Sequence, residues 1–191
     1  MKSWSSCFLL LALVLSACNE KKVHEQQLLL DINQLIDAQI TSLSQARDSI
    51  AKTSAMNGRQ SFTHFLPTRE ILESELDMYR QLDDINKKTL RDGYTRSEVD
   101  DTKSNLKIYQ FSNDLARVSE VRIFYHEHLT QVKRIEGVVK EANQLYVNWK
   151  KLSLEFDEIN GLPKLVAYGF DGYQKTVMRD TIHFSIRASI K

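Results

Sequence analysis

Apolar residues recur every seven positions over much of the first 160 residues. In the first such stretch, Leu29, Ile36, Leu43 and Ile50 keep this spacing. Residues seven apart lie on the same face of a helix, so these four form one apolar stripe. The pattern therefore predicts a helix over residues 27–52.

A second helix is predicted over residues 68–91, after a loop at residues 53–67. The loop contains Asn57-Gly58 and ends at Pro67, and the pattern loses its period there. Within the helix the spacing of seven returns, and Asp92-Gly93 indicates its C-terminal end. The repeating residues are Ile71, Met78 and Ile85.

The longest helical pattern covers residues 96–159. Thr95-Arg96-Ser97-Glu98 fits a capping box, a signature of helix starts, and Asn160-Gly161 with Pro163 closes the pattern. An unbroken helix of this length would span about 95 Å. It is either broken near residues 112–114, where Ser, Asn and Asp favour helix caps, or it forms a protruding arm. The apolar seam comprises Val118, Val121, Tyr125, His128, Val132, Ile135, Val139, Ala142, Tyr146 and Trp149.

The period changes near the C-terminus, where strands are predicted over residues 164–170, 173–179 and 181–190. Asp171-Gly172 is a favoured hairpin turn, and the last segment alternates apolar and polar residues without exception. The expected fold is α+β but mainly α. It is an antiparallel bundle of long helices followed by a small antiparallel β-hairpin or three-stranded meander, in one domain over residues 27–191.

The N-terminus has the features of an export signal. Lys2 precedes the apolar stretch Phe8 to Leu15, which is too short to span a bilayer. The run Leu15-Ser16-Ala17-Cys18 then resembles the lipobox of bacterial lipoproteins, an aliphatic residue and two small ones before a cysteine. The resemblance implies a signal peptide over residues 1–17, cleavage between Ala17 and Cys18, and lipid on Cys18. It concerns processing only and implies no fold.

The same resemblance implies a location in the cell envelope. Lipoproteins of enterobacteria that carry Asp after the cysteine tend to stay at the inner membrane, and this chain has Asn19. The expected location is therefore the outer membrane, facing the periplasm, with the membrane as partner through the lipid on Cys18. Residues 18–26 form a short tether, of which residues 19–26 span at most about 25–30 Å.

Charge and cysteine content exclude several classes of function. Without the signal peptide the chain has 25 basic and 25 acidic residues, so no net charge recruits nucleic acid, and none is predicted as a partner. Cys7 belongs to the signal peptide and Cys18 carries lipid. No cysteine remains for a disulfide or for nucleophilic catalysis.

The only conspicuous cluster of candidate ligands is Tyr125-His126-Glu127-His128. Thr130 stands where the metalloprotease motif His-Glu-x-x-His needs its second histidine. On the predicted helix, His126 and His128 would point about 200° apart, which prevents shared coordination. We therefore predict no metal, no cofactor and no catalytic residues, with these two histidines as the candidates if a metal is bound.

The function predicted from the sequence is non-enzymatic. A membrane-tethered periplasmic lipoprotein would bind another envelope protein, with an inhibitor, immunity or exclusion factor as narrower versions. The alternative is an envelope protein that binds a metal or small ligand through His126 and His128.

Overall fold

A computed structural model describes residues 30–191, which form one nine-stranded antiparallel sheet with two α-helices on one face. The predicted helical bundle and coiled-coil seam are therefore wrong, because most of the chain is β-strand. The predicted signal peptide, Cys18 and the predicted tether lie outside the described residues.

The helices and strands follow one another along the chain as follows. The helical elements are α1 (Ile32–Gln45), α2 (Arg69–Leu76) and the 3-10 segments η1 (Asp77–Asn86), η2 (Arg91–Gly93) and η3 (Leu129–Gln131). The strands are β1 (Ile50–Met56), β2 (Arg59–Phe65), β3 (Thr95–Asp101), β4 (Leu106–Ser112), β5 (Val118–Tyr125), β6 (Val132–Ala142), β7 (Tyr146–Ile159), β8 (Leu162–Thr176) and β9 (Ile182–Ile190).

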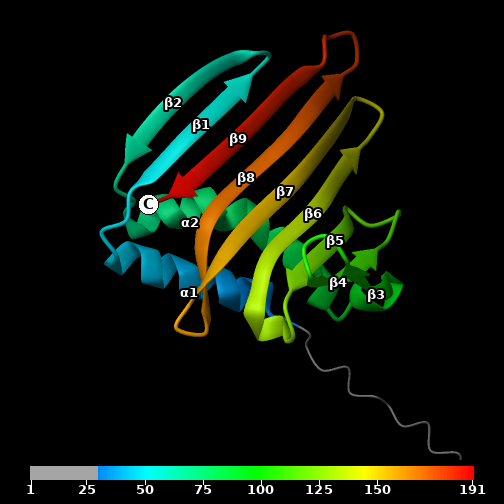
Figure 1. Cartoon of the computed structure of the whole chain (residues 1–191). Coiled ribbons are helices and arrows are strands. Elements are labelled where there is room, and N and C mark those ends of the chain that lie inside the picture. Colours follow the sequence, from blue (N-terminus) through cyan, green and yellow to red (C-terminus); the bar gives the residue numbers. More distant parts are fainter. Residues whose placement is uncertain (1–29) are drawn as a thin grey trace, which may run out of the picture.

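The strands are ordered β2-β1-β9-β8-β7-β6-β5-β4-β3 across the sheet. Strands β3 to β9 form a meander of successive hairpins, and β9 then pairs with β1. The N-terminal hairpin β1–β2 is thus joined to the rest of the sheet through the last strand of the chain (Figure 1). The two edge strands are β2 and β3.

The range 96–159, predicted as helix, forms five strands. Its apolar residues also alternate with period two: Val121, Ile123 and Tyr125 lie on one face of β5, and Ile135 and Val139 on the same face of β6. Val, Ile and Tyr favour strands, and the alternation buries one face of the sheet. Short alternating segments that follow one another along the sequence also place apolar residues three and four positions apart. This spacing imitates the heptad pattern of a helix.

Both Asn-Gly dipeptides form tight hairpin turns. Asn57 and Gly58 have φ of 49° and 82°, and Asn160 and Gly161 have φ of 54° and 76°. These left-handed values are those of type I′ turns, which Asn-Gly favours. The predicted turn at Asp171-Gly172 is wrong, because these residues pair within the continuous strand β8.

The two helices lie within the first two predicted helical ranges but are shorter. Asp31 caps α1 by accepting a hydrogen bond from the Gln34 amide at 2.7 Å, and Thr68 caps α2. After α1 the chain turns and enters β1, so the end of the predicted range 27–52 is strand. The chain from α2 through η1 stays helical in character up to Asn86.

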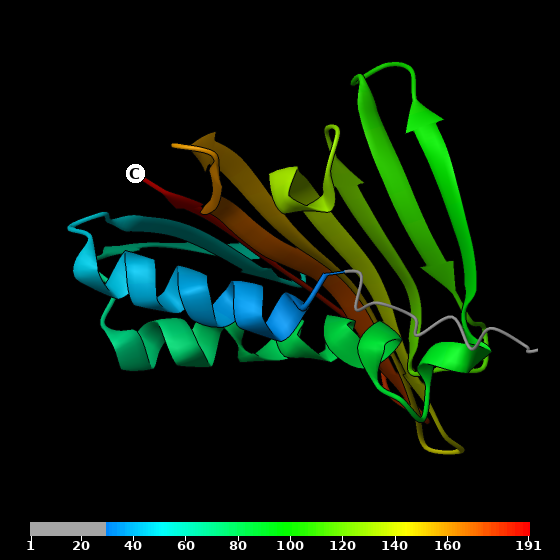
Figure 2. The same ribbon diagram turned by 90° about the horizontal axis from the view of Figure 1, so that it is seen from below.

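One face of the sheet packs on the helices and contains the core. Figure 2 shows α1 and α2 side by side against this face, which we call the helix-side face. The helices contribute residues with essentially no exposed surface, and the facing strands do the same. Fully buried members include Ile36, Leu43, Leu72, Leu76, Leu82, Val121, Ile123, Ile135 and Leu152.

Asp83 of η1 holds the first turn of α1 in place. Its carboxylate accepts hydrogen bonds from the Ile32 amide at 3.0 Å, from Asn33 Nδ2 at 3.1 Å and from Asn86 Nδ2 at 2.7 Å. Burial is the largest influence on this group and raises the pKa of Asp83, although the hydrogen bonds from Asn86 and Ile32 oppose the rise. The carboxylate therefore accepts hydrogen bonds that stabilise the first turn of α1. Burial of its negative charge is nevertheless unfavourable.

We expect Asp83→Ala to lower the free energy of unfolding by about 1–3 kcal/mol, because buried donors lose their acceptor. Asp83→Asn keeps an acceptor oxygen and should cost less. Since the folded pKa exceeds the unfolded one, the native state binds the proton more tightly. The contribution of Asp83 to stability therefore rises as the pH falls through its folded pKa. Urea titrations from pH 7 to pH 4 check this, and an Asp83→Asn variant that keeps the same pH slope as wild type contradicts it.

Candidate functional site

The helices cover only part of the helix-side face. Figure 1 shows the strands extending beyond α1 and α2 at the end that carries the β1–β2, β6–β7 and β8–β9 turns. We call this end the open end. There the face is hollowed by a cavity of about 900 Å³, within the size range of small-ligand sites.

Two rows of paired residues form the floor of this hollow. The outer row runs across β1, β9, β8 and β7 as Met56, Phe184, Gly172 and Lys150. The row nearer the helices runs as Ser54, Ile186, Phe170 and Leu152. Directly paired residues of antiparallel strands project from the same face, so the apolar members form a continuous surface.

Gly172 shapes the centre of the floor. A Cβ atom at this position would lie 2.6 Å from Cε2 of Phe184, so the phenyl ring occupies the space that a side chain would need. The same ring packs edge-on against Phe170, with centroids 5.9 Å apart and planes at 68°. Both rings are half-buried, which leaves part of their surface open to the hollow.

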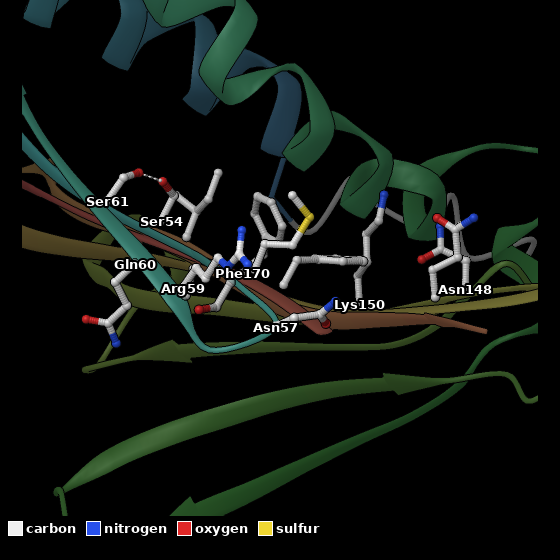
Figure 3. Close-up of a pocket in the computed structure, with 14 residues that line it drawn as sticks. Ser54, Asn57, Arg59, Gln60, Ser61, Asn148, Lys150 and Phe170 are labelled. Atoms are coloured by element: carbon white, nitrogen blue, oxygen red, sulfur yellow. Dashed lines mark hydrogen bonds between the residues drawn. The ribbon is translucent and has the colours of Figure 1, made fainter. Parts of the chain in front are cut away.

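The lining is positively charged. It contains Lys150 and Arg59 but no acidic residue, and neither cation forms an ion pair with any residue in the range 30–191. In Figure 3, Lys150 rises from the sheet toward the helical side. The Asn148 side-chain oxygen has no hydrogen-bond partner among the described residues. Neutral polar groups complete the wall, with the Ser54 and Ser61 hydroxyls 2.7 Å apart.

A half-buried polar cluster links the sheet to α2 next to the floor of the hollow. Lys52 is two residues before Ser54 and therefore lies on the same face of β1. It forms an ion pair with Glu75 of α2. Tyr168 is two residues before Phe170 in β8, and its hydroxyl donates a hydrogen bond to Glu75 Oε2 at 3.2 Å. Burial raises the pKa of Tyr168, and the Glu75 charge adds to the effect, so the phenol stays protonated and remains a donor.

The two histidines predicted as candidate ligands lie at the far end of β5, away from this hollow. His126 follows the last residue of β5 and lines a polar hollow of about 720 Å³ with Asp100, Asp101 and Glu127. His128 is extended and precedes η3, outside that lining. Within residues 30–191 no three His, Cys, Asp or Glu side chains are grouped to hold a metal ion.

Sequence reasoning missed most of the site for two reasons. The helix predicted over residues 96–159 scattered Lys150 and Asn148 around a cylinder, and the turn predicted at Asp171-Gly172 separated Phe170 from its neighbours. The strict alternation of residues 181–190 did place Phe184 and Ile186 on one face, which the register of β9 confirms. The alternation of Leu152, Leu154 and Phe156 in β7, together with the Asn160-Gly161 turn, was the signal available.

No family model matches the chain, and no curated protein or solved structure is significantly similar to it. Of the part that the structure describes, neither helix has the length and apolar character needed to cross a membrane.

Proposed function

We propose that this protein binds an amphipathic anion, a molecule with an acyl-type apolar body and a carboxylate or phosphate group, in the hollow at the open end. The observation that carries the proposal is the lining itself. An apolar floor of Phe170, Phe184 and Ile186 lies beside two unpaired cations, and no acid opposes them. The apolar body would cover the two rings, and the anionic group would contact Lys150 or Arg59.

The remaining polar groups support the same ligand class. Asn148 has an amide oxygen without a partner, and Gln174 stands beside it across the β7–β8 pair. These groups can bind a hydroxyl or an amide next to the anionic group. A purely apolar ligand would leave them unsatisfied, which is unfavourable in a partly enclosed site.

The proposal keeps part of the function predicted from the sequence. A lipoprotein held at the outer membrane through Cys18 and facing the periplasm remains our proposal, and so does its non-enzymatic role. The partner in the hollow becomes an amphipathic small molecule in place of an envelope protein. The histidine pair is not used in this proposal.

Calorimetric titration of the chain from residue 19 tests the proposal. The core residues and strands that the structure describes belong to residues 30–191, so this chain retains the complete described fold. We expect dodecanoate to bind, and dodecyltrimethylammonium, with the same tail and the opposite charge, to bind at least tenfold more weakly. Equal affinities, or no binding of either probe, would contradict the proposal.

The role of Lys150 can be tested against its neighbour in sequence. Lys150→Gln is expected to weaken dodecanoate binding about tenfold, because it removes a charged hydrogen-bond donor worth about 1.5 kcal/mol. Lys151→Gln makes the same change of net charge on the opposite face, where Lys151 lies 3.4 Å from Glu136. This control should bind like wild type. Equal losses in the two variants would show that only net charge matters.

A further inference from the structure

We propose that the turns at the open end bind the surface of an anionic lipid bilayer. This surface lies beside the hollow, and the inference does not depend on the ligand proposed for it. The turns of interest are residues 143–145 between β6 and β7 and residues 177–181 between β8 and β9. Their apolar side chains project into solvent: Met178 is 99% exposed, Leu145 68% and Val177 54%.

The two turns that carry these side chains lie next to each other. The Val177 amide donates a hydrogen bond to the Leu145 carbonyl at 2.9 Å, which holds the two turns together. Exposed apolar residues are ordinary when single, but a group of them on adjacent turns indicates a contact surface. Met56, 59% exposed at the end of β1, lies at the same end of the sheet.

Met178 occupies a position where another type of residue would stabilise the fold better. Its φ of 62° lies in the left-handed region, which Gly and Asn adopt at much lower cost. Its side chain gains nothing by packing, since it is almost fully exposed. A methionine that is unfavourable for both backbone and solvent is explained if the exposed side chain has a partner.

The charges around these turns favour an anionic partner. Lys140, Lys175 and Arg179 are exposed and form no ion pair with residues of the described range, whereas Glu141 is paired with Arg117. Asp180 is the acidic residue in the longer turn. Basic residues close to an anionic bilayer are attracted to its surface. Apolar side chains on convex turns can enter the interface between headgroups and acyl chains, whereas a protein partner would have to supply pockets for them.

The arrangement is compatible with a tether at the other end of the molecule. Leu30 lines a hollow together with Leu162, the first residue of β8. The 15 residues of β8 extend about 50 Å from there to the open end. Residues 18–29 reach at most about 40 Å. The open end therefore meets the tethering bilayer with the domain tilted.

Vesicle co-sedimentation of the chain from residue 19 tests the proposal, because this chain lacks both the signal peptide and Cys18. Vesicles of phosphatidylglycerol mixed with phosphatidylethanolamine are expected to bind it, and vesicles of phosphatidylcholine at least tenfold more weakly. Met178→Asn combined with Leu145→Ser should weaken binding to the anionic vesicles at least tenfold. Its thermal unfolding temperature should not fall, since Asn favours the left-handed conformation.

Leu162→Ser provides the matched control. Leu162 is 69% exposed, like Leu145, but lies at the opposite end of β8. This variant should bind anionic vesicles like wild type. Equal losses in the control and the double variant would overturn the proposal, as would equal binding to neutral and anionic vesicles. A wild-type chain that does not bind vesicles but dimerises through these turns would also overturn the proposal. Dodecanoate titration is done without vesicles, so failure of one proposal leaves the other measurable.

Discussion

Leu82→Ala and Gly137→Ala are each expected to destabilise the fold, and the double variant is expected to be more stable than the sum of the two changes predicts. Leu82 of η1 has no exposed surface and packs directly over Gly137 of β6. A Cβ atom at residue 137 would overlap with Cδ2 of Leu82. The glycine therefore sets how closely the helical layer approaches the sheet.

The expected magnitudes follow from cavity formation and overpacking. Leu82→Ala should lower the free energy of unfolding by about 2–5 kcal/mol, since it leaves a cavity in a buried layer. Gly137→Ala should cost about 1–3 kcal/mol, because a methyl group enters occupied space. In the double variant the new methyl group fills part of the cavity. The coupling should then be favourable by about 0.5–3 kcal/mol, as found for residues in contact.

Urea unfolding of wild type and the three variants measures this coupling. The measurement requires similar m-values in all four proteins, which shows that the change lies in stability and not in the extent of unfolding. Additive effects of the two substitutions would mean that the helical layer does not rest on the sheet at Gly137.

Phe184→Asp is expected to abolish binding of amphipathic anions to the hollow. The substitution removes half of the aromatic pair that forms the floor and places a negative charge where the apolar body should lie. Loss of the apolar contact alone is worth about 1.5–3 kcal/mol, and repulsion of the anionic ligand adds to it. We expect a decrease in affinity for dodecanoate of at least a hundredfold.

His183→Asp is the control for this prediction. His183 is the preceding residue of β9, so its side chain projects from the opposite face, where it lies beside Tyr173 at 6.1 Å between ring centroids. The control should keep wild-type affinity. Circular dichroism of both variants checks that the sheet is intact. If a folded Phe184→Asp still bound dodecanoate normally, the hollow would not be the binding site.

The sequence correctly predicted those helices and strands whose signals come from residues close together in the chain. The alternation in residues 181–190 determines one face of β9, and the helix predicted from residue 68 begins where the structure places the start of α2. The central strands could not be distinguished from helix by the same reasoning. Their alternating segments are short, and turn signals between them such as Asn113-Asp114 and Asn143 also fit interruptions of a helix.

The site could be predicted even less well, because its members come from strands far apart in the sequence. Met56 and Phe184 are neighbours only because β9 pairs with β1, a contact between the two ends of the chain. No local pattern encodes that pairing. The charge asymmetry of the lining likewise becomes visible only when Arg59 and Lys150 are brought to one hollow.

The most direct test of the central claim is a titration of the isotopically labelled chain from residue 19 with dodecanoate, followed by amide chemical shifts in NMR spectra. The account predicts that the largest changes occur at Phe170, Gly172, Phe184 and Ile186, with Lys150 among them, and that His126 and Leu162 stay unchanged. Changes centred on His126, or spread evenly over the sheet, would contradict the claim that the hollow at the open end is the binding site.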